Sequence, residues 1–151
     1  MRNRKAAALL QSRGPAVILG AVLGLGIGAA AGIGLANVAP PSEHKGLEVT
    51  TLGVIPAASM EAQIGLSSYK LQLREITIAP GGQIAKHSHE GRAGRVKVID
   101  GTWTEGRPSG EADFASDAAT GILEDRETVH WFWNRGDEPA TALVCDIVPA
   151  S

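Results

Sequence analysis

The sequence has little of several features that define common classes of protein. It contains one cysteine, Cys145, in 151 residues, so an intramolecular disulfide is excluded and no cysteine-rich metal pattern exists. Basic clusters are also missing from most of the chain, because residues 37–151 carry 10 lysines and arginines against 16 aspartates and glutamates, a net charge of −6. An acidic domain without a basic patch lacks the electrostatic footprint of nucleic-acid binding, so we expect no nucleic-acid partner.

Charge is absent from residues 15–36, a run of 22 mostly apolar residues. A membrane-spanning helix needs about 20 such residues. The basic tip at residues 1–14 is expected to stay cytoplasmic, which places the rest of the chain on the outer, periplasmic side. The run is either a retained transmembrane helix, which its length favours, or a signal peptide cleaved after Gly34-Leu35-Ala36. The sequence therefore predicts a membrane-anchored or secreted domain.

Residues 37–46 contain two prolines and several polar residues, which is typical of a linker, and we expect the folded domain to span residues 47–151. In that domain the apolar residues recur with a period of two, as at Tyr69, Leu71 and Leu73, which indicates strands. The phase changes at residues 74–75, before the apolar Ile76 and Ile78, and such a change indicates a bulge or a bend.

Turn residues divide the domain into short segments. We expect turns at residues 79–82 and 107–110 and a hairpin turn at residues 100–101. The expected strands lie at 69–78, 95–99, from 102 onward, at 128–133 and at 141–148, and one short helix lies at 57–62. Such frequent turns are typical of an all-β antiparallel sandwich or barrel. Cys145 is expected to be a small buried residue of the last strand.

Three histidines lie in two of these segments. His87 and His89 are two positions apart, so on a strand they project from the same face. His130, on a later strand, completes a three-nitrogen metal site if the two strands are neighbours. The alternative is a set of hydrogen-bonded core imidazoles, and three histidines together favour the metal, for which imidazole is the commonest ligand. His44, in the linker, is expected to be solvated.

The motifs around these histidines resemble those of a single-domain cupin, of the cupin-2, quercetin-dioxygenase-like type, over residues 66–150. The first cupin motif has a glycine, His-x-His, an acid and a later glycine. The two glycines correspond here to Gly82 and Gly101, and the histidines to His87 and His89. The second motif has a histidine followed four residues later by asparagine, here His130 and Asn134. The resemblance implies an antiparallel jelly-roll β-barrel preceded by the N-terminal helix, with the histidines inside the barrel.

The resemblance also implies that His87, His89 and His130 bind a divalent metal ion, with iron, zinc, manganese and nickel all acceptable. The glutamate of the first motif does not carry over, because Ala93 stands four residues after His89. Three-histidine sites occur among thiol and diketone dioxygenase cupins. Each metal-binding imidazole also needs a hydrogen-bond partner for its other ring N–H, and as these partners we expect Gln83, Thr128 and Asn134.

Two functions follow from this resemblance. The first is a metal-dependent enzyme that acts on a small molecule, of a dioxygenase or isomerase type; its catalytic residues stay unassigned, although Glu105, Glu124 and Glu127 are acids near the motifs. The second is a non-catalytic cupin that binds or senses a small ligand outside the cytoplasmic membrane. Trp131 and Trp133 alternate with His130 and should face away from the lumen, toward another segment or toward a second subunit in a homodimer.

Overall fold

The structure is a computed structural model that describes residues 39–150. The predicted basic tip at residues 1–14 and the predicted membrane segment at residues 15–36 lie outside the described residues. In the described range, no helix is long and apolar enough to cross a membrane. From Lys45 onward the chain consists mostly of strands; those after residue 69 include the predicted ones, whereas no strand was predicted at Lys45–Ile55. The elements are β1 (Lys45–Ile55), α1 (Ala57–Ile64), β2 (Tyr69–Ser88), β3 (Ala93–Asp100), β4 (Thr102–Arg107), β5 (Gly110–Ala115), β6 (Ile122–Glu124), β7 (Val129–Trp133) and β8 (Ala140–Pro149).

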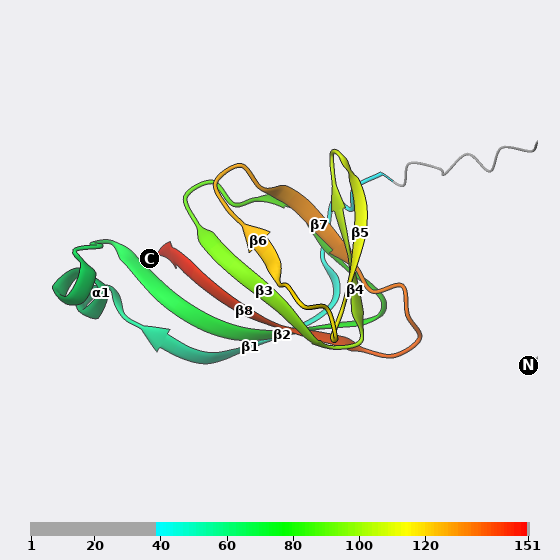
Figure 1. Ribbon diagram of the computed structural model, residues 1–151, viewed down its shortest axis with the longest axis horizontal. Coiled ribbons are helices and arrows are strands. Elements are labelled where there is room, and N and C mark those ends of the chain that lie inside the picture. The colour runs from blue at the N-terminus through cyan, green and yellow to red at the C-terminus, as the bar shows by residue number, and fades with distance from the viewer. Residues whose placement is uncertain (1–38, 151) are drawn as a thin grey trace, which may run out of the picture. The chain divides into compact units, whose positions relative to one another are not determined.

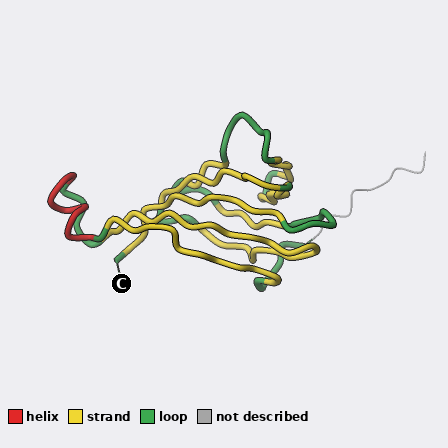
Figure 2. Tube along the Cα trace, turned by 90° about the horizontal axis from the view of Figure 1, so that it is seen from below, coloured by secondary structure: helices red, strands yellow, loops and turns green. Residues whose placement is uncertain are grey.

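All strand pairs are antiparallel, and the order is β5-β4-β7-β2-β8-β3-β6, with β1 on the other edge of β2 (Figure 1). The one helix of residues 39–150, α1, lies at one end of the strands (Figure 2). It begins after Pro56 and ends at Gly65, whose φ of 69° is easy only for glycine. The helix predicted at residues 57–62 is confirmed and is two residues longer.

The 20-residue strand β2 connects the two halves of the sheet. Its first part pairs with β8 from Tyr69 to Ile78, and its last part pairs with β7 from Gln83 to Ser88. The predicted turn at residues 79–82 is wrong, because the chain bends here but continues in one strand. Asn134 holds the bend: its amide donates to the carbonyl oxygens of Ile78 and Glu138, and its backbone N–H donates to Gly82.

The predicted hairpin at residues 100–101 is also wrong. Gly101 has the positive φ, 67°, that suits a tight turn. However, β4 does not return along β3, because β3 pairs with β6 and β8, whereas β4 pairs with β5 and β7. The turn therefore takes the chain across the barrel from one half of the sheet to the other.

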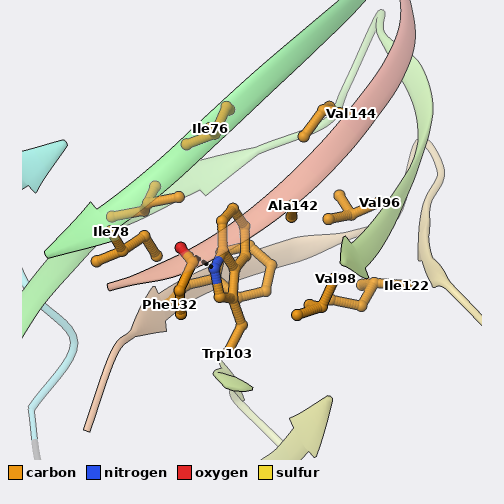
Figure 3. Close-up of a cluster of buried hydrophobic side chains, with 11 residues drawn as sticks. Ile76, Ile78, Val96, Val98, Trp103, Ile122, Phe132, Ala142 and Val144 are labelled. Carbon is orange, nitrogen blue, oxygen red and sulfur yellow. Dashed lines mark hydrogen bonds between the residues drawn. The ribbon is translucent and has the colours of Figure 1, made fainter. Parts of the chain in front are cut away.

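The core lies between the two halves of the sheet and takes residues from both (Figure 3). It consists of buried apolar side chains at alternate strand positions: Ile76, Ile78, Ile84, Val96, Val98, Trp103, Ile122, Phe132, Ala140, Ala142 and Val144. Trp103 is 1% exposed, and its indole N–H donates to the carbonyl of Ala140 at 3.0 Å, the dashed line in Figure 3. The large ring is thereby buried without leaving its polar atom unpaired.

Two other expectations need correction. Cys145 is exposed, because the buried face of β8 carries Ala142, Val144 and Asp146 and the cysteine lies between them. The irregularity predicted at residues 74–75 is only partly right: the β2–β8 pairing keeps one register throughout, but the β1–β2 pairing shifts between Thr51 and Gly53, opposite Arg74 and Leu73. The phase change arises because Arg74 occupies the same face as Ile76 and binds buried Asp146.

His130 and Phe132 lie on the inner face of β7, and Asn134 directly follows the strand; all three are at most 2% exposed. Trp131 and Trp133 lie on the other face but are only 6% and 9% exposed. Their rings meet edge to face at 6.1 Å, and Trp131 lies against Gly106, where a Cβ atom would be 2.0 Å from the indole nitrogen. The two rings therefore leave little area for a second subunit, and the homodimer stays a prediction.

Candidate metal centre

The structure brings the three predicted histidines together. His87 lies near the end of β2 and is paired in register with His130 on β7. His89 follows β2, and its backbone N–H donates to the carbonyl of Thr128, just before β7. The three Nε2 atoms form a nearly equilateral triangle, with separations of 3.0 Å for His87–His89, 3.1 Å for His87–His130 and 3.0 Å for His89–His130.

Hydrogen bonds fix the tautomers of two of these rings. The Nδ1 atom of His87 lies 2.8 Å from the carbonyl oxygen of Ala85, and that of His130 lies 2.7 Å from a carboxylate oxygen of Glu105. Both oxygens accept hydrogen bonds, so each Nδ1 carries the proton. In neutral rings both Nε2 atoms then hold lone pairs, and these lone pairs face each other across 3.1 Å. Such an arrangement is repulsive unless a cation lies between the nitrogens.

The electrostatics keep the rings of His87 and His89 neutral. Burial, helped by the neighbouring imidazoles and Arg92, lowers the pKa of His87 to about 4 and that of His89 to about 3. Neutral imidazole is the form that binds metals. Nitrogens held at about 2.1 Å from one ion and at right angles to each other would lie roughly 3.0 Å apart, so the triangle matches the size of a metal centre.

A fourth candidate ligand is Glu124, at the end of β6, which sequence reasoning did not assign to the metal site. Its Oε1 atom lies 3.4 Å from Nε2 of His89 and 3.6 Å from Nε2 of His130, and its side chain is 4% exposed. The four ligand atoms of this metal cluster, His87, His89, Glu124 and His130, all lie within 4.8 Å of one another.

Glu124 takes the place of the carboxylate that the first cupin motif lacks. The inward-facing position at this level of β3 is Gly94, not Ala93, which is exposed. Gly94 is paired in register with Glu124, and a Cβ atom at Gly94 would be 2.5 Å from Oε2 of Glu124. The missing side chain on β3 therefore makes room for a carboxylate that enters from β6. The signal in the sequence was the alternation in Ile122-Leu123-Glu124, whose outer members are buried.

Burial raises the pKa of Glu124 to about 7, with Arg92 opposing this and Asp146 adding to it. Its Oε2 atom is buried and has no hydrogen-bond partner among the described residues. An unpaired buried carboxylate oxygen costs free energy unless something binds it. A divalent cation among the four ligand atoms would bind Oε1 of this carboxylate and the facing lone pairs, so the residues present fit such an ion.

Glu105, on β4, orients His130 from behind. It is 4% exposed, accepts from Nδ1 of His130 and accepts from Nε of Arg107 at 2.8 Å. Burial acts to raise its pKa, but the hydrogen bonds from His130 and Arg107 outweigh burial and lower it. The result is a carboxylate–histidine arrangement of the kind that tunes metal ligands.

The residues expected to accept hydrogen bonds from the histidine rings do not do so. The amide of Gln83 donates to the carbonyl of Glu43, Asn134 holds the bend in β2, and the Thr128 hydroxyl donates to Asp125. Glu127 is exposed. His44 is exposed as expected, yet its Nδ1 accepts from the backbone N–H of Ala85 at 3.1 Å.

A cavity of about 300 Å³ adjoins the cluster. His87 and Glu124 form part of its wall, together with Arg74, Arg92 and His44. The rest of the lining is apolar: Leu47, Val49, Ile76, Ile84, Val96, Trp103, Phe132 and Val144. A mostly apolar cavity with a few convergent polar groups is the usual form of a small-molecule site.

Comparisons with known proteins give the fold a name. No protein-family model and no curated protein matches the sequence. Among solved structures, a predicted oxalate decarboxylase from Thermotoga maritima aligns with a TM-score of 0.53 and 15% identity, over 74% of this chain and 94% of that one. The cupin_2 domain of an XRE-family transcriptional regulator from Enterobacter cloacae aligns with a TM-score of 0.51 and 16% identity, over 71% of this chain and all of that one.

The described domain has the cupin fold. A third match, the cupin domain of Cnp3 from Schizosaccharomyces pombe, agrees with a TM-score of 0.52 at 9% identity, over 72% of this chain and 69% of that one. At such identities the likeness establishes the fold alone. The predicted all-β cupin architecture is thus confirmed for the described residues, and the cluster lies between strands of this barrel.

Proposed function

We propose that this cupin domain binds a divalent metal ion through His87, His89 and His130, with Glu124 as the fourth ligand. The observation that carries the proposal is the pair of facing Nε2 lone pairs on His87 and His130, 3.1 Å apart, in rings whose Nδ1 atoms are already engaged. When bound, the ion would supply Lewis acidity and open coordination positions for a small molecule. Iron, zinc, manganese and nickel all accept imidazole and carboxylate ligands.

We further propose that the site acts on a small molecule held in the adjoining cavity, in a reaction of the dioxygenase or isomerase type. The apolar lining supports this because it would exclude water from the reacting groups. Non-catalytic binding or sensing of a small ligand is the second candidate. It is favoured by the described lining of the cavity, which contains no carboxylate besides Glu124 that could act as a general acid or base.

Metal content tests the first step. The chain is expressed in medium supplemented with iron, zinc, manganese and nickel, and the purified protein is examined by elemental analysis. We expect close to one equivalent of metal in the wild type and a loss of most of it in the His87→Ala, His130→Ala double variant. His44→Ala is the matched control and should retain the metal. A metal-free wild type, or full occupancy in the double variant, would sink the proposal.

We also propose that residues 15–36 direct the cupin domain across the cytoplasmic membrane. The support is the uncharged run of 22 residues after a basic tip. Fusion of alkaline phosphatase, which is active only after export, to residue 46 should give active enzyme in a bacterial host. Inactive fusion protein that accumulates in the cytoplasm would contradict the export of this domain.

A further inference from the structure

Two arginines on the wall of the cavity, beside the metal ligands, share one buried aspartate behind the wall. Arg74 lies on β2, Arg92 lies in the connection between β2 and β3, and Asp146 lies on β8. The Nη2 atoms of Arg74 and Arg92 lie 2.8 Å and 3.0 Å from the same carboxylate oxygen, Oδ2 of Asp146. We name these three residues the arginine cluster.

The arginine cluster holds more positive charge than its carboxylate can neutralise. The Asp146 side chain is fully buried, so its single negative charge faces two guanidinium groups. The one carboxylate in the described lining of the cavity is that of Glu124, which would be paired with the bound ion. An excess of one positive charge in a partly buried site is costly unless an anion offsets it.

The hydrogen bonds of the arginine cluster are also incomplete. An arginine that serves only as an ion-pair partner commonly grips a carboxylate with two nitrogens. Here each guanidinium uses one nitrogen, and both nitrogens share one oxygen. The Nε atoms of Arg74 and Arg92 are buried, and neither has a partner among the described residues. The other terminal nitrogen of each guanidinium, Nη1, makes no hydrogen bond to a described residue either, so the pair keeps donors for an incoming ligand besides the buried Nε atoms.

The cavity indicates what that ligand looks like. Arg74 and Arg92 line the same space as His87 and Glu124, and eight apolar side chains line the remainder. Guanidinium groups match the planar geometry of a carboxylate, whereas the apolar walls favour a hydrocarbon body. A volume of about 300 Å³ limits the ligand to a small molecule.

We infer that the cavity binds a small carboxylic acid with an apolar body, whose carboxylate contacts Arg74 and Arg92 next to the metal cluster. The inference rests on the proposed function for the metal that lies beside the acid. The contact between the acid and the arginines does not itself require the metal. Arg74 stays paired to Asp146, and Arg92, whose side chain is 32% exposed, is free to adjust to the ligand.

Matched acids and amides test the inference. The full-length chain in mild detergent is loaded with zinc and titrated by calorimetry with acetate, 3-methylbutanoate and benzoate, and with the amide of each. We expect 3-methylbutanoate or benzoate to bind, and its neutral amide to bind at least about tenfold more weakly, because a charge-assisted hydrogen bond is lost. Equal binding of acid and amide in every pair, or no binding of any acid, would overturn the inference.

Variants assign the binding to the arginines. Arg92→Gln should weaken binding of the acid by at least about tenfold while the zinc content stays unchanged. Arg95→Gln is the matched control, because Arg95 lies on β3, is exposed and binds the carbonyl of Gly121 outside the cavity. If Arg92→Gln lowers folding by circular dichroism, Arg92→Lys replaces it; lysine keeps the charge but loses the planar fork, so a smaller loss is expected. Unchanged acid binding in the folded variant contradicts the inference.

Titration of the metal-free chain separates this inference from the metal proposal. Acid binding that survives removal of zinc and still needs Arg92 supports the arginine cluster, whatever the outcome for the metal. Acid binding that needs zinc but not Arg92 overturns the inference and leaves the metal proposal standing.

Discussion

At the scale of single residues, the metal cluster depends on the missing side chain at Gly94, which leaves room for the carboxylate of Glu124. The two residues are paired in register, so a side chain at one position occupies the space used by the other. Glu124→Ala should weaken zinc binding at least about tenfold, since even outer partners of metal ligands contribute roughly 10–100-fold. Adding Gly94→Glu to this variant should restore much of the affinity, because the carboxylate then enters from β3. Affinity is measured by competition with a chromogenic chelator.

The control for Glu124→Ala is Glu127→Ala, which also removes a carboxylate, but from an exposed position three residues further along the chain. Its zinc affinity should equal that of the wild type. If Glu124→Ala also binds zinc like the wild type, Glu124 is not a ligand and the site holds three histidines only.

Glu105 acts on the metal through His130 rather than directly. Glu105→Ala should leave the Nδ1–H of His130 without an acceptor, so the ring loses its fixed tautomer and orientation. We expect zinc affinity to fall about 10–100-fold. Imidazole nitrogen NMR of the metal-free chain should show the His130 tautomer becoming mixed, which a loss of packing alone would not produce. Glu111→Ala, which removes an exposed carboxylate paired with Arg135, should change neither measurement.

At the scale of elements, the bend in β2 decides whether His87 reaches His130. A Cβ atom at Gly82 would lie 2.7 Å from the carbonyl oxygen of Ala79 and 2.9 Å from that of Lys45, so Gly82→Ala must distort the backbone. We expect a loss of about 1–3 kcal/mol in the free energy of unfolding. Urea denaturation measures it, with Gly53→Ala on β1 as control, because that Cβ would meet nothing within 4 Å. Equal stability of the two variants would show that the bend tolerates a side chain.

The elements also show what the sequence could reveal. Alternation located β3, β7 and β8 to within a few residues, and it placed His130 and Phe132 on one inner face, because a period of two is a local property. The turn residues at 79–82 and 100–101 misled, since a glycine-rich bend within a strand and a crossing between sheet halves use the same residues as hairpins. Glu124 could not be assigned, because its role depends on the pairing of β6 with β3, which no local pattern encodes.

At the scale of the whole molecule, burial of the cluster links its ionisation to the stability of the domain. The lowered pKa values of His87 and His89, about 4 and 3, mean that the unfolded chain binds nearly two more protons than the native one once the pH is well below the ordinary value of 6.5. Glu124 opposes this, because its pKa is raised from 4.5 to about 7 and the native state keeps its proton. The histidines therefore prevail by about one proton from about pH 5.5 down to about 4.5, and by less near pH 6.5.

Stability of the metal-free chain should therefore fall as the pH is lowered from 6.5 to 4.5. A difference of one proton corresponds to about 1.4 kcal/mol per pH unit, which sets the upper scale of the effect. Urea unfolding in the presence of a chelator measures it at several pH values. The His87→Gln, His89→Gln double variant loses the contributions of both histidines and keeps that of Glu124. Its free energy of unfolding should therefore stay constant or rise as the pH is lowered. A wild-type stability that rises on acidification would mean that Glu124, and not the pair of histidines, controls the charge of the metal-free cluster.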